Sequence, residues 1–392
     1  MRQWQARILL ALLVALPSLV LRIGGIHLAP LPSLLIYGVA VVAAAFILAW
    51  AAEAAEVDIS AGLAVALLAL IAVLPEYAVD LYFAWTSGSR PEYAQYAAAN
   101  MTGSNRLLIG VGWPLVVFVF MLGARGRGER FRGIILDPHR RVELAFLAAA
   151  GAFAFVVPLT GQLGLATGLV LLALFAYYMT KVAREERREP ELLGIAAHLA
   201  ALPRRSRRAT VSLLFAAAAA FVLSAAEPFA NALVQTGRQF GIDEFLLVQW
   251  LAPLASESPE LIVAMLFAFR GKSDKAFGTL LSSKVNQWTL LVGSIPLAHL
   301  IGGGGFSLGL DARQTEEFIL TAAQTILGFA VIANLRFSLR EAALLLALFA
   351  LQFPFPQTGI RIGFSVAYLA VAAVLLVRER RELPTIFREL LP

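Results

Sequence analysis

The chain has 392 residues, of which 59% are hydrophobic and 15% charged, and its mean hydropathy is +0.77. This composition is typical of a polytopic membrane protein and excludes an ordinary soluble enzyme. The sequence contains no cysteine, which excludes disulfide bonds and metal sites with thiolate ligands. The net charge of +6 would suit a nucleic-acid-binding protein. The placement of the basic residues argues against such a partner, as follows.

Apolar stretches long enough to cross about 30 Å of hydrocarbon recur along the whole chain. They predict an all-α polytopic membrane protein with about twelve transmembrane helices. The first stretch has a basic start like that of a secretory signal, but no small-residue cleavage site follows it, so we expect it to be retained as a span. The predicted spans are 6–24, 32–52, 60–86, 91–122, 142–160, 163–182, 208–235, 243–270, 275–301, 315–334, 337–354 and 360–377.

The basic residues predict the orientation of these spans, because cytoplasmic loops carry an excess of Lys and Arg. If the N-terminus is cytoplasmic and the chain crosses twelve times, the inner segments hold 25 of the 32 basic residues. The outer segments hold five, namely Arg22, Arg90, Arg238, Arg313 and Arg361. One inner segment, 53–58, is acidic instead. We expect a multi-pass protein of the cell (inner) membrane with both termini cytoplasmic. The bilayer, and not nucleic acid, then accounts for the charge pattern.

A polar segment divides the chain into two halves of similar length. Residues 183–207 predict a cytoplasmic linker between a first transmembrane half, 1–182, and a second, 208–392. Each half contains one copy of a repeated pattern, at about 70–112 and about 253–293.

The repeats can be recognised in two places, in the same order in each half. LPEYAVDLYFAW at 74–85 and SPELIVAMLFAF at 258–269 are identical at five of twelve positions. Further on, SNRLLIGVG at 104–112 aligns with VNQWTLLVG at 285–293. Because the first repeat starts on a span predicted to run outward and the second on one predicted to run inward, the repeats are inverted. Inverted repeats that meet at the bilayer midplane form the substrate site of many secondary transporters.

Polar side chains lie inside the apolar spans of both repeats. Glu76 and Asp80 are spaced to share one helix face, and Glu257 and Glu260 flank Pro259. A carboxylate at this depth is costly unless it is paired, solvated or protonated. Because the Pro–Glu element recurs in both repeats, we favour a ligand role for Glu76 and Glu260. For Asp80 and Glu257, neutralising a nearby basic residue is an equally good interpretation. Pro259, and Gly103 in MTGSN, predict interruptions of the helices that carry them. Hydroxyl and amide groups accompany the acids at Ser256, Asn100, Ser104, Asn105, Asn286 and Thr289.

These oxygens are hard ligands, which suit Ca²⁺, Na⁺ or Mg²⁺ rather than zinc or copper. For Asn105 and Asn286, hydrogen bonding between helices is an equally good interpretation. The sequence therefore predicts that small inorganic cations are the partners of this protein.

The repeats also resemble a known family. LPEYAVD followed by AAANMTGSNRLL, and SESPELIVA followed by SSKVNQWTLL, are similar to the two alpha-repeats of the cation/calcium antiporter superfamily, typified by sodium/calcium exchangers. The resemblance implies two inverted five-helix units that give alternating access to a central cation site, and the two remaining helices would lie one at each terminus. It implies that Glu76 and Glu260 bind the cation, with Ser104 and Ser256 as further ligands.

The chain departs from the family pattern at several ligand positions. Asp80 stands where the family has a small polar residue, and Glu257 replaces a hydroxyl. In the second repeat, Lys284 occupies a glycine position and Val285 that of a liganding serine. We therefore do not expect the complete set of sites of a standard sodium/calcium exchanger.

Two basic residues, Arg106 and Lys284, lie inside predicted spans and not in loops. Against the four acids of the repeats they leave two negative charges, which match one divalent cation, or two monovalent cations or protons. We hypothesise that Lys284 takes the place of one Na⁺ and releases a proton when a cation enters. Alternatively, Asp80 with Arg106, and Glu257 with Lys284, form buried ion pairs that fix the packing of the helices.

Together these features predict a secondary-active cation antiporter that moves Ca²⁺ or Na⁺ against Na⁺ or H⁺. It needs no cofactor, and the transported cations bind transiently. The alternatives are a proton-coupled cation exchanger that uses Lys284, and a degenerate membrane protein that no longer transports. An intramembrane enzyme is disfavoured, because no H-E-x-x-H or other recognisable catalytic motif occurs in a span.

Overall fold

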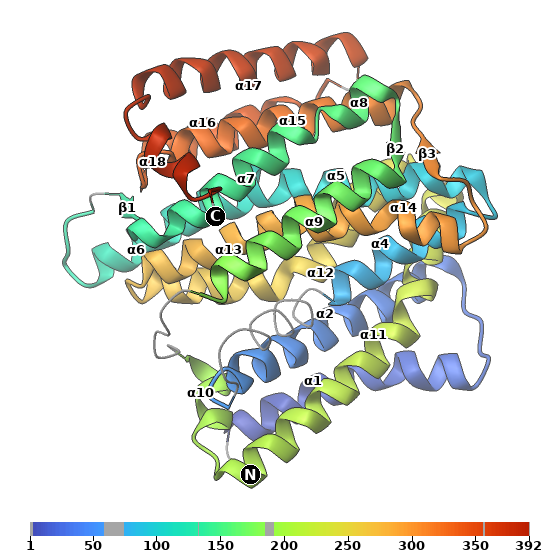
Figure 1. The fold of residues 1–392 in the computed structure, drawn as a ribbon. Helices are drawn as coiled ribbons and strands as arrows, with labels where there is room; N and C mark the ends of the chain where they lie inside the picture. The colour runs from blue at the N-terminus through green and yellow to red at the C-terminus, as the bar shows by residue number, and fades with distance from the viewer. Residues whose placement is uncertain (1–2, 59–73, 132, 185–191, 356, 392) are drawn as a thin grey trace. The chain divides into compact units, whose positions relative to one another are not determined.

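The computed structural model is built from α-helices that form two compact units (Figure 1). Unit 1 comprises Met1–Phe83 and Met179–Pro259, and unit 2 comprises Ala84–Tyr178 and Glu260–Pro392. Three helices contribute residues to both units: α4 (Leu74–Ser87), α9 (Leu165–Val182) and α12 (Glu244–Phe269). The structure describes residues 3–58, 74–131, 133–184, 192–355 and 357–391.

In unit 1, the helices α1 (Gln3–Ile23), α2 (Pro30–Ala55) and α11 (Arg204–Phe240) lie side by side (Figure 1). Pro30 opens α2, at a position where its missing N–H costs no hydrogen bond. Gly38 lets α2 approach α11 closely, since a Cβ there would lie 3.0 Å from the ring of Phe229. The face of α1 that lies opposite its contacts with α2 and α11 is apolar and exposed, as expected of a helix in contact with lipid.

One ion pair joins the end of α2 to the start of α11. Arg207 donates to both carboxylate oxygens of Asp58, at 2.7 and 2.9 Å. The same guanidinium donates to the carbonyl oxygens of Ala200, the last residue of α10 (Gly194–Ala200), and of Leu202, just after it. The hydrogen bonds from Arg207 lower the pKa of Asp58 to about 2. Arg207, near the start of α11, thus links the residues after α2 to the end of α10.

In unit 2, α15 (Ala312–Ile332) is a largely buried helix, since 83% of its most apolar 18-residue stretch is buried. For α17 (Thr358–Arg378), which runs beside it, the corresponding share is 22% (Figure 1). α15 also packs against α5, α7 and α8. The remaining short helical turns are η1 (Pro91–Tyr93) and η3 (Pro138–Arg140). The helices of unit 2 are α5 (Ala94–Leu107), α6 (Trp113–Gly126), α7 (Arg141–Phe153), α8 (Val156–Thr160), α13 (Ser273–Asn286), α14 (Val292–Ile301), α15 (Ala312–Ile332), α16 (Leu339–Leu351), α17 (Thr358–Arg378) and α18 (Leu383–Arg388).

Two very short antiparallel strand pairs connect loops of unit 2. β1 (Ile134–Ile135) pairs with β4 (Arg336–Phe337), and β2 (Gln162–Gly164) pairs with β3 (Ser307–Gly309). These strand pairs hold the ends of loops next to each other. They are too short to change the fold class, which is all-α.

The two repeats share a local irregularity. α5 and α13 are each 14 residues long, and each continues directly into a five-residue π-helical turn, η2 (Leu108–Gly112) and η4 (Gln287–Leu291). π-helical turns inside α-helices occur frequently at functional sites. The irregularity therefore marks the same place in both repeats.

Nine of the predicted spans coincide with helices that are long and apolar enough to cross a membrane, counted over the described residues. The span predicted at 275–301 is divided into α13, η4 and α14. At 337–354 the structure has α16, a helix of 13 residues, which alone rises only about 20 Å. Parts of three predictions lie outside the described residues: 60–73 of the span 60–86, the start of the first repeat, and 185–191 of the linker 183–207. The rest of that span, 74–86, is helical and belongs to α4.

Two predicted helix interruptions are wrong. Gly103 lies within the continuous helix α5, and the irregular turn begins five residues later. Pro259 likewise lies inside the continuous helix α12. Proline has no N–H to offer the carbonyl oxygen of Ala255 one turn earlier, and the hydroxyl of Ser258 donates to that oxygen instead, at 3.2 Å. This substitute bond explains why the helix continues through Pro259.

Candidate functional site

Unit 1 holds four of the predicted ligands, and all four are buried. Glu76 and Asp80, on α4, are 4% and 0% exposed and share one face of the helix. Ser256 and Glu257, on α12, are also buried. The Ser256 hydroxyl donates to the carbonyl oxygen of Ala252 at 3.1 Å, which leaves the lone pairs of its oxygen available to a cation.

Unit 2 holds the predicted ligands of α5. Asn100 and Ser104 are spaced to share a helix face, and both are fully buried. Among the described residues, the Ser104 hydroxyl has no hydrogen-bond partner. Burying a hydroxyl without a hydrogen-bond partner is costly unless a ligand or a water molecule satisfies it. The oxygen of Ser104 is therefore available to bind a cation. Ser104 is thus the predicted ligand that geometry supports most directly.

Lys284 and Asn105 lie in direct contact within unit 2. The ammonium of Lys284 donates to the backbone oxygen of Asn105 at 2.6 Å and to its side-chain oxygen at 2.5 Å. Lys284 is 0% exposed, and its Nζ also lies 5.6 Å from the centre of the Trp288 ring, close enough for a cation–π interaction. The amide nitrogen of Asn105 donates to the carbonyl oxygen of Met101, which fixes the orientation of the side chain. The sequence predicted both residues for the site, but not this bond.

The second repeat supplies further predicted ligands to unit 2. Ser283, beside Lys284, donates its hydroxyl to the Glu260 carboxylate at 2.8 Å. The Thr289 hydroxyl donates to the carbonyl oxygen of Val285 at 2.6 Å, and Asn286 is also buried. Ser283 and Lys284 are adjacent on α13, so one turn of this helix contacts both Glu260 of α12 and Asn105 of α5.

Arg106 has a partner that the sequence interpretation did not include. Its guanidinium forms an ion pair with Glu317 of α15 and donates to the side-chain oxygen of Gln352 at 2.6 Å. Glu317 also pairs with Arg361 of α17, and the Nε of Arg361 lies 3.5 Å from Glu316. These four charged side chains are at most 8% exposed. Arg106 thus balances an acid outside the repeats, which the charge count over the two repeats left out.

Sequence reasoning missed Glu316, Glu317 and Arg361 because each lies close to the predicted end of a span. Arg361 was counted among the outer basic residues, and the two glutamates fall at the start of the span at 315–334. The signal that could have found them is the polar spacing inside that span: Glu317, Thr321, Gln324 and Thr325 recur at helical intervals.

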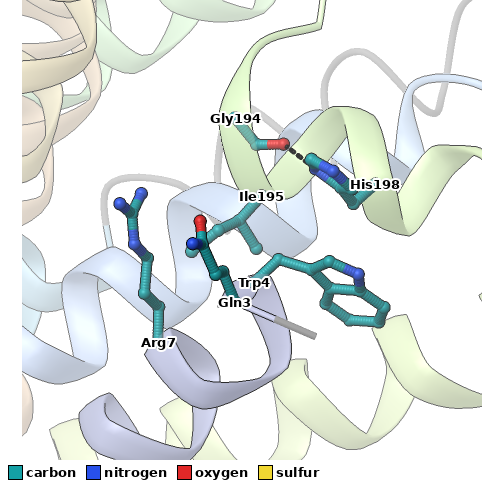
Figure 2. A pocket seen from close by; sticks show the side chains of 6 residues that line it. All are labelled: Gln3, Trp4, Arg7, Gly194, Ile195 and His198. Atoms are coloured by element: carbon teal, nitrogen blue, oxygen red, sulfur yellow. Dashed lines mark hydrogen bonds between the residues drawn. The ribbon is translucent and has the colours of Figure 1, made fainter. Parts of the chain in front are cut away.

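A separate pocket of about 470 Å³ lies between the start of α1 and α10 in unit 1 (Figure 2). His198 stacks on Trp4, and its Nδ1 lies 2.7 Å from the carbonyl oxygen of Gly194. Among the described residues, six line the pocket, and they include Arg7 but no carboxylate. This pocket therefore lacks the ligands of a cation site.

Comparison with known proteins identifies the family. The sequence matches the family model described as sodium/calcium exchanger protein over residues 30–183 and again over 210–355. The chain belongs to the sodium/calcium exchanger family. The two matched segments fall one on each side of the predicted linker, and a comparison with curated protein sequences finds no match.

Solved structures agree with this assignment. The crystal structure of H⁺/Ca²⁺ exchanger CAX is 42% identical in sequence, covers 99% of each chain and has a TM-score of 0.92. The Ca²⁺/H⁺ antiporter protein YfkE is 16% identical, with 91% of this chain and 99% of that chain covered and a TM-score of 0.63. The sodium-calcium exchanger NCX_Mj is 15% identical, with 84% of this chain and 99% of that chain covered and a TM-score of 0.55. The last two show a shared fold.

The family confirms the central predictions from the sequence. The chain is a multi-pass membrane protein and a cation antiporter of the cation/calcium class, and not an enzyme. The resemblance seen in the two repeats was therefore correct.

Proposed function

We propose that this antiporter exchanges Ca²⁺ for H⁺, with Lys284 serving as a fixed cation in its site. The observation that carries the proposal is the buried ammonium of Lys284, bonded to both oxygens of Asn105. Those oxygens belong to the first repeat, at a position suited to ligate a metal ion. Because the ammonium occupies them, fewer oxygens remain for Na⁺, which favours protons as the coupling ion.

The H⁺/Ca²⁺ exchanger CAX supports the same choice of ions, since it is 42% identical over nearly the whole of both chains. Identity at this level supports the same type of exchange in this chain, in addition to the same fold. NCX_Mj, a sodium-calcium exchanger, is far less similar, at 15% identity.

The exchange itself is a competition for carboxylates. Glu76 and Glu260 are the proposed principal ligands, and two carboxylates can either hold one Ca²⁺ or take up two protons with the same change in charge. Ser104 supplies a hydroxyl oxygen whose bonds are otherwise unfilled among the described residues. The other proposed ligands, in addition to Glu76, Glu260 and Ser104, are Asp80, Asn100, Asn105, Ser256, Glu257, Asn286 and Thr289.

The proposed architecture has about twelve transmembrane helices in two inverted five-helix repeats, with one further helix at each terminus. The two halves are 1–182 and 208–392, joined by the linker 183–207, and both termini are cytoplasmic. The matching lengths of α5 and α13, and the π-helical turn after each, support the repeat. The distribution of Lys and Arg supports the orientation.

The proposal is tested by ion flux in proteoliposomes. Vesicles are loaded at an imposed pH gradient or with a Na⁺ gradient, and ⁴⁵Ca²⁺ uptake is measured for the wild type, Glu76→Gln and Glu260→Gln. We expect the pH gradient to drive uptake and each substitution to abolish it. Glu129→Gln is the matched control, because Glu129 is an exposed carboxylate paired with Arg127 in the loop after α6.

Two other results would each overturn the proposal. Uptake driven by Na⁺ and not by the pH gradient would make the protein a sodium-coupled exchanger despite Lys284. No uptake of Ca²⁺ or ²²Na⁺ under any gradient would favour a degenerate member of the family, in which the acids of SESPEL have only a structural role.

A further inference from the structure

Helix α15 carries a line of polar side chains that contact residues of both repeats. Glu317, Gln324 and Thr325 are seven and eight residues apart, so they lie on one face of the helix. Each bonds a residue of unit 2 outside α15. Glu317 pairs with Arg106, and the amide of Gln324 donates to the Arg106 backbone oxygen at 3.2 Å. The hydroxyl of Thr325 accepts from the indole N–H of Trp288 at 2.8 Å.

The residues held by α15 are neighbours of the Asn105–Lys284 contact. Arg106 follows Asn105 in α5. Trp288 lies one helical turn beyond Lys284, and its ring lies 5.6 Å from the Lys284 ammonium. One buried helix, outside the repeated segments 70–112 and 253–293, therefore holds a residue adjacent to each partner of the contact.

We propose that Glu317, Gln324 and Thr325 form a positioning stripe, which keeps Asn105 and Lys284 at bonding distance during transport. The inference rests on the proposed role of that contact in the cation site. Cation affinity depends on ligand placement, and a shift of about 1 Å in a functional group can reduce activity by about a hundredfold. None of the three side chains needs to touch the transported ion.

Charge makes Glu317 the most sensitive member of the stripe. Its carboxylate lies between the guanidinium groups of Arg106 and Arg361, and all three are buried. Along this chain of ion pairs, Arg106–Glu317–Arg361–Glu316, positive and negative side chains alternate, and their charges sum to zero. Neutralising Glu317 leaves two guanidinium groups without the carboxylate they share. The resulting positive charge lies one residue from Asn105, where it opposes the entry of a divalent cation.

The experiment compares two test variants with two matched controls, using ⁴⁵Ca²⁺ uptake by the full chain in proteoliposomes. Glu317→Gln and Thr325→Val each remove one link from α15 to a repeat. Glu129→Gln makes the same change of charge at an exposed carboxylate that pairs with Arg127, outside this network of buried charges. Thr321→Val makes the same loss of a hydroxyl on the same face, where the hydroxyl donates only within α15, to the Glu317 carbonyl oxygen at 2.6 Å.

We expect both test variants to raise the KM for Ca²⁺ about tenfold, the usual effect of altering a group that supports a metal ligand. Both controls should keep KM within about twofold of the wild type. Size-exclusion profiles and melting temperatures of all four variants separate a change in KM from a loss of folded protein. If Glu317→Gln does not fold, the Thr325→Val and Thr321→Val pair decides the question alone.

The results distinguish this inference from the proposed function. If the wild type transports Ca²⁺ and the test variants alter only stability, with KM unchanged, the positioning stripe is rejected and the proposed function stands. An equal rise in KM in the controls also rejects it, because the effect would then not depend on the bonds that α15 makes to Arg106 and Trp288. Absence of pH-driven uptake by the wild type would reject the proposed function first.

Discussion

Replacing Lys284 with glutamine tests whether its ammonium stands in for a sodium ion. In the wild type the ammonium makes two charge-assisted hydrogen bonds to Asn105, at 2.5 and 2.6 Å, in a position with no solvent exposure. Hydrogen bonds to charged groups contribute about 1.5–3 kcal/mol each, and a neutral amide that donates one bond recovers about 1 kcal/mol. With the lower cost of burying an uncharged group included, we expect Lys284→Gln to lower the free energy of unfolding by about 2 kcal/mol.

The same substitution should create a response to sodium. The glutamine side chain adds a carbonyl oxygen and frees an oxygen of Asn105, so the position gains ligands that suit Na⁺. An ion that binds only the folded state at a hundred times its dissociation constant stabilises it by about 2.7 kcal/mol. Sodium should therefore offset the loss of stability in Lys284→Gln and leave the wild type unchanged.

The assay is thermal unfolding of purified protein in NaCl and in choline chloride at equal ionic strength, followed by flux under a Na⁺ gradient. Lys275→Gln is the matched control, because Lys275 lies on the same helix at its other end, over the ring of Phe267. Equal melting temperatures of Lys284→Gln in the two salts, together with a pH dependence of transport like that of the wild type, would refute the role assigned to the ammonium.

Two predictions concern stability. The pKa of Asp58 is lowered to about 2 from an ordinary value of 3.8, so its pairing with Arg207 stabilises the folded state above pH about 4 and is lost as the pH falls toward 2. Asp58→Asn should therefore lose about 1 kcal/mol at pH 7, a value reduced for solvent screening, and should show a flatter dependence of melting temperature on pH between 4 and 2 than the wild type. Gly110→Ala should destabilise unit 2 by about 1–3 kcal/mol in chemical or thermal unfolding, because the new Cβ would lie 2.3 Å from the ring of Phe349. Gly126→Ala, where a Cβ meets nothing within 4 Å, should change stability little, and equal effects of the two would contradict the packing argument.

The parts of the site that the sequence predicts are those with a local signal. Glu76, Glu260 and Lys284 are charged residues inside long apolar windows, where a charge is rare enough to indicate a function. The Pro–Glu elements repeat at a constant offset, so the family could be recognised from a few residues. These residues could therefore be selected as candidates for the site without knowledge of the tertiary structure.

The pairing of buried charges had no such signal. Arg106 and Glu317 are separated by 211 positions in the sequence, and no periodicity within either helix relates them. Without the structure, the acids of the repeats were the obvious partners for Arg106, and Glu317 was not considered. Arg361 was assigned to an outer segment because it lies next to the predicted end of a span, and position along the sequence is the only criterion when loop charges are counted. In the structure its side chain is only 8% exposed.

The irregular turns after α5 and α13 show a similar limit on local reasoning. The first, LIGVG, contains two glycines, whereas the second, QWTLL, contains none, yet both adopt the same π-helical form. A glycine signal would have found only the first, and the glycine that we did select, Gly103, lies in regular helix. Because unlike sequences give the same irregularity at matching places, tertiary packing and not local propensity must set it. In both repeats the turn begins within three residues of a partner in the Asn105–Lys284 contact, so packing and site geometry are determined together.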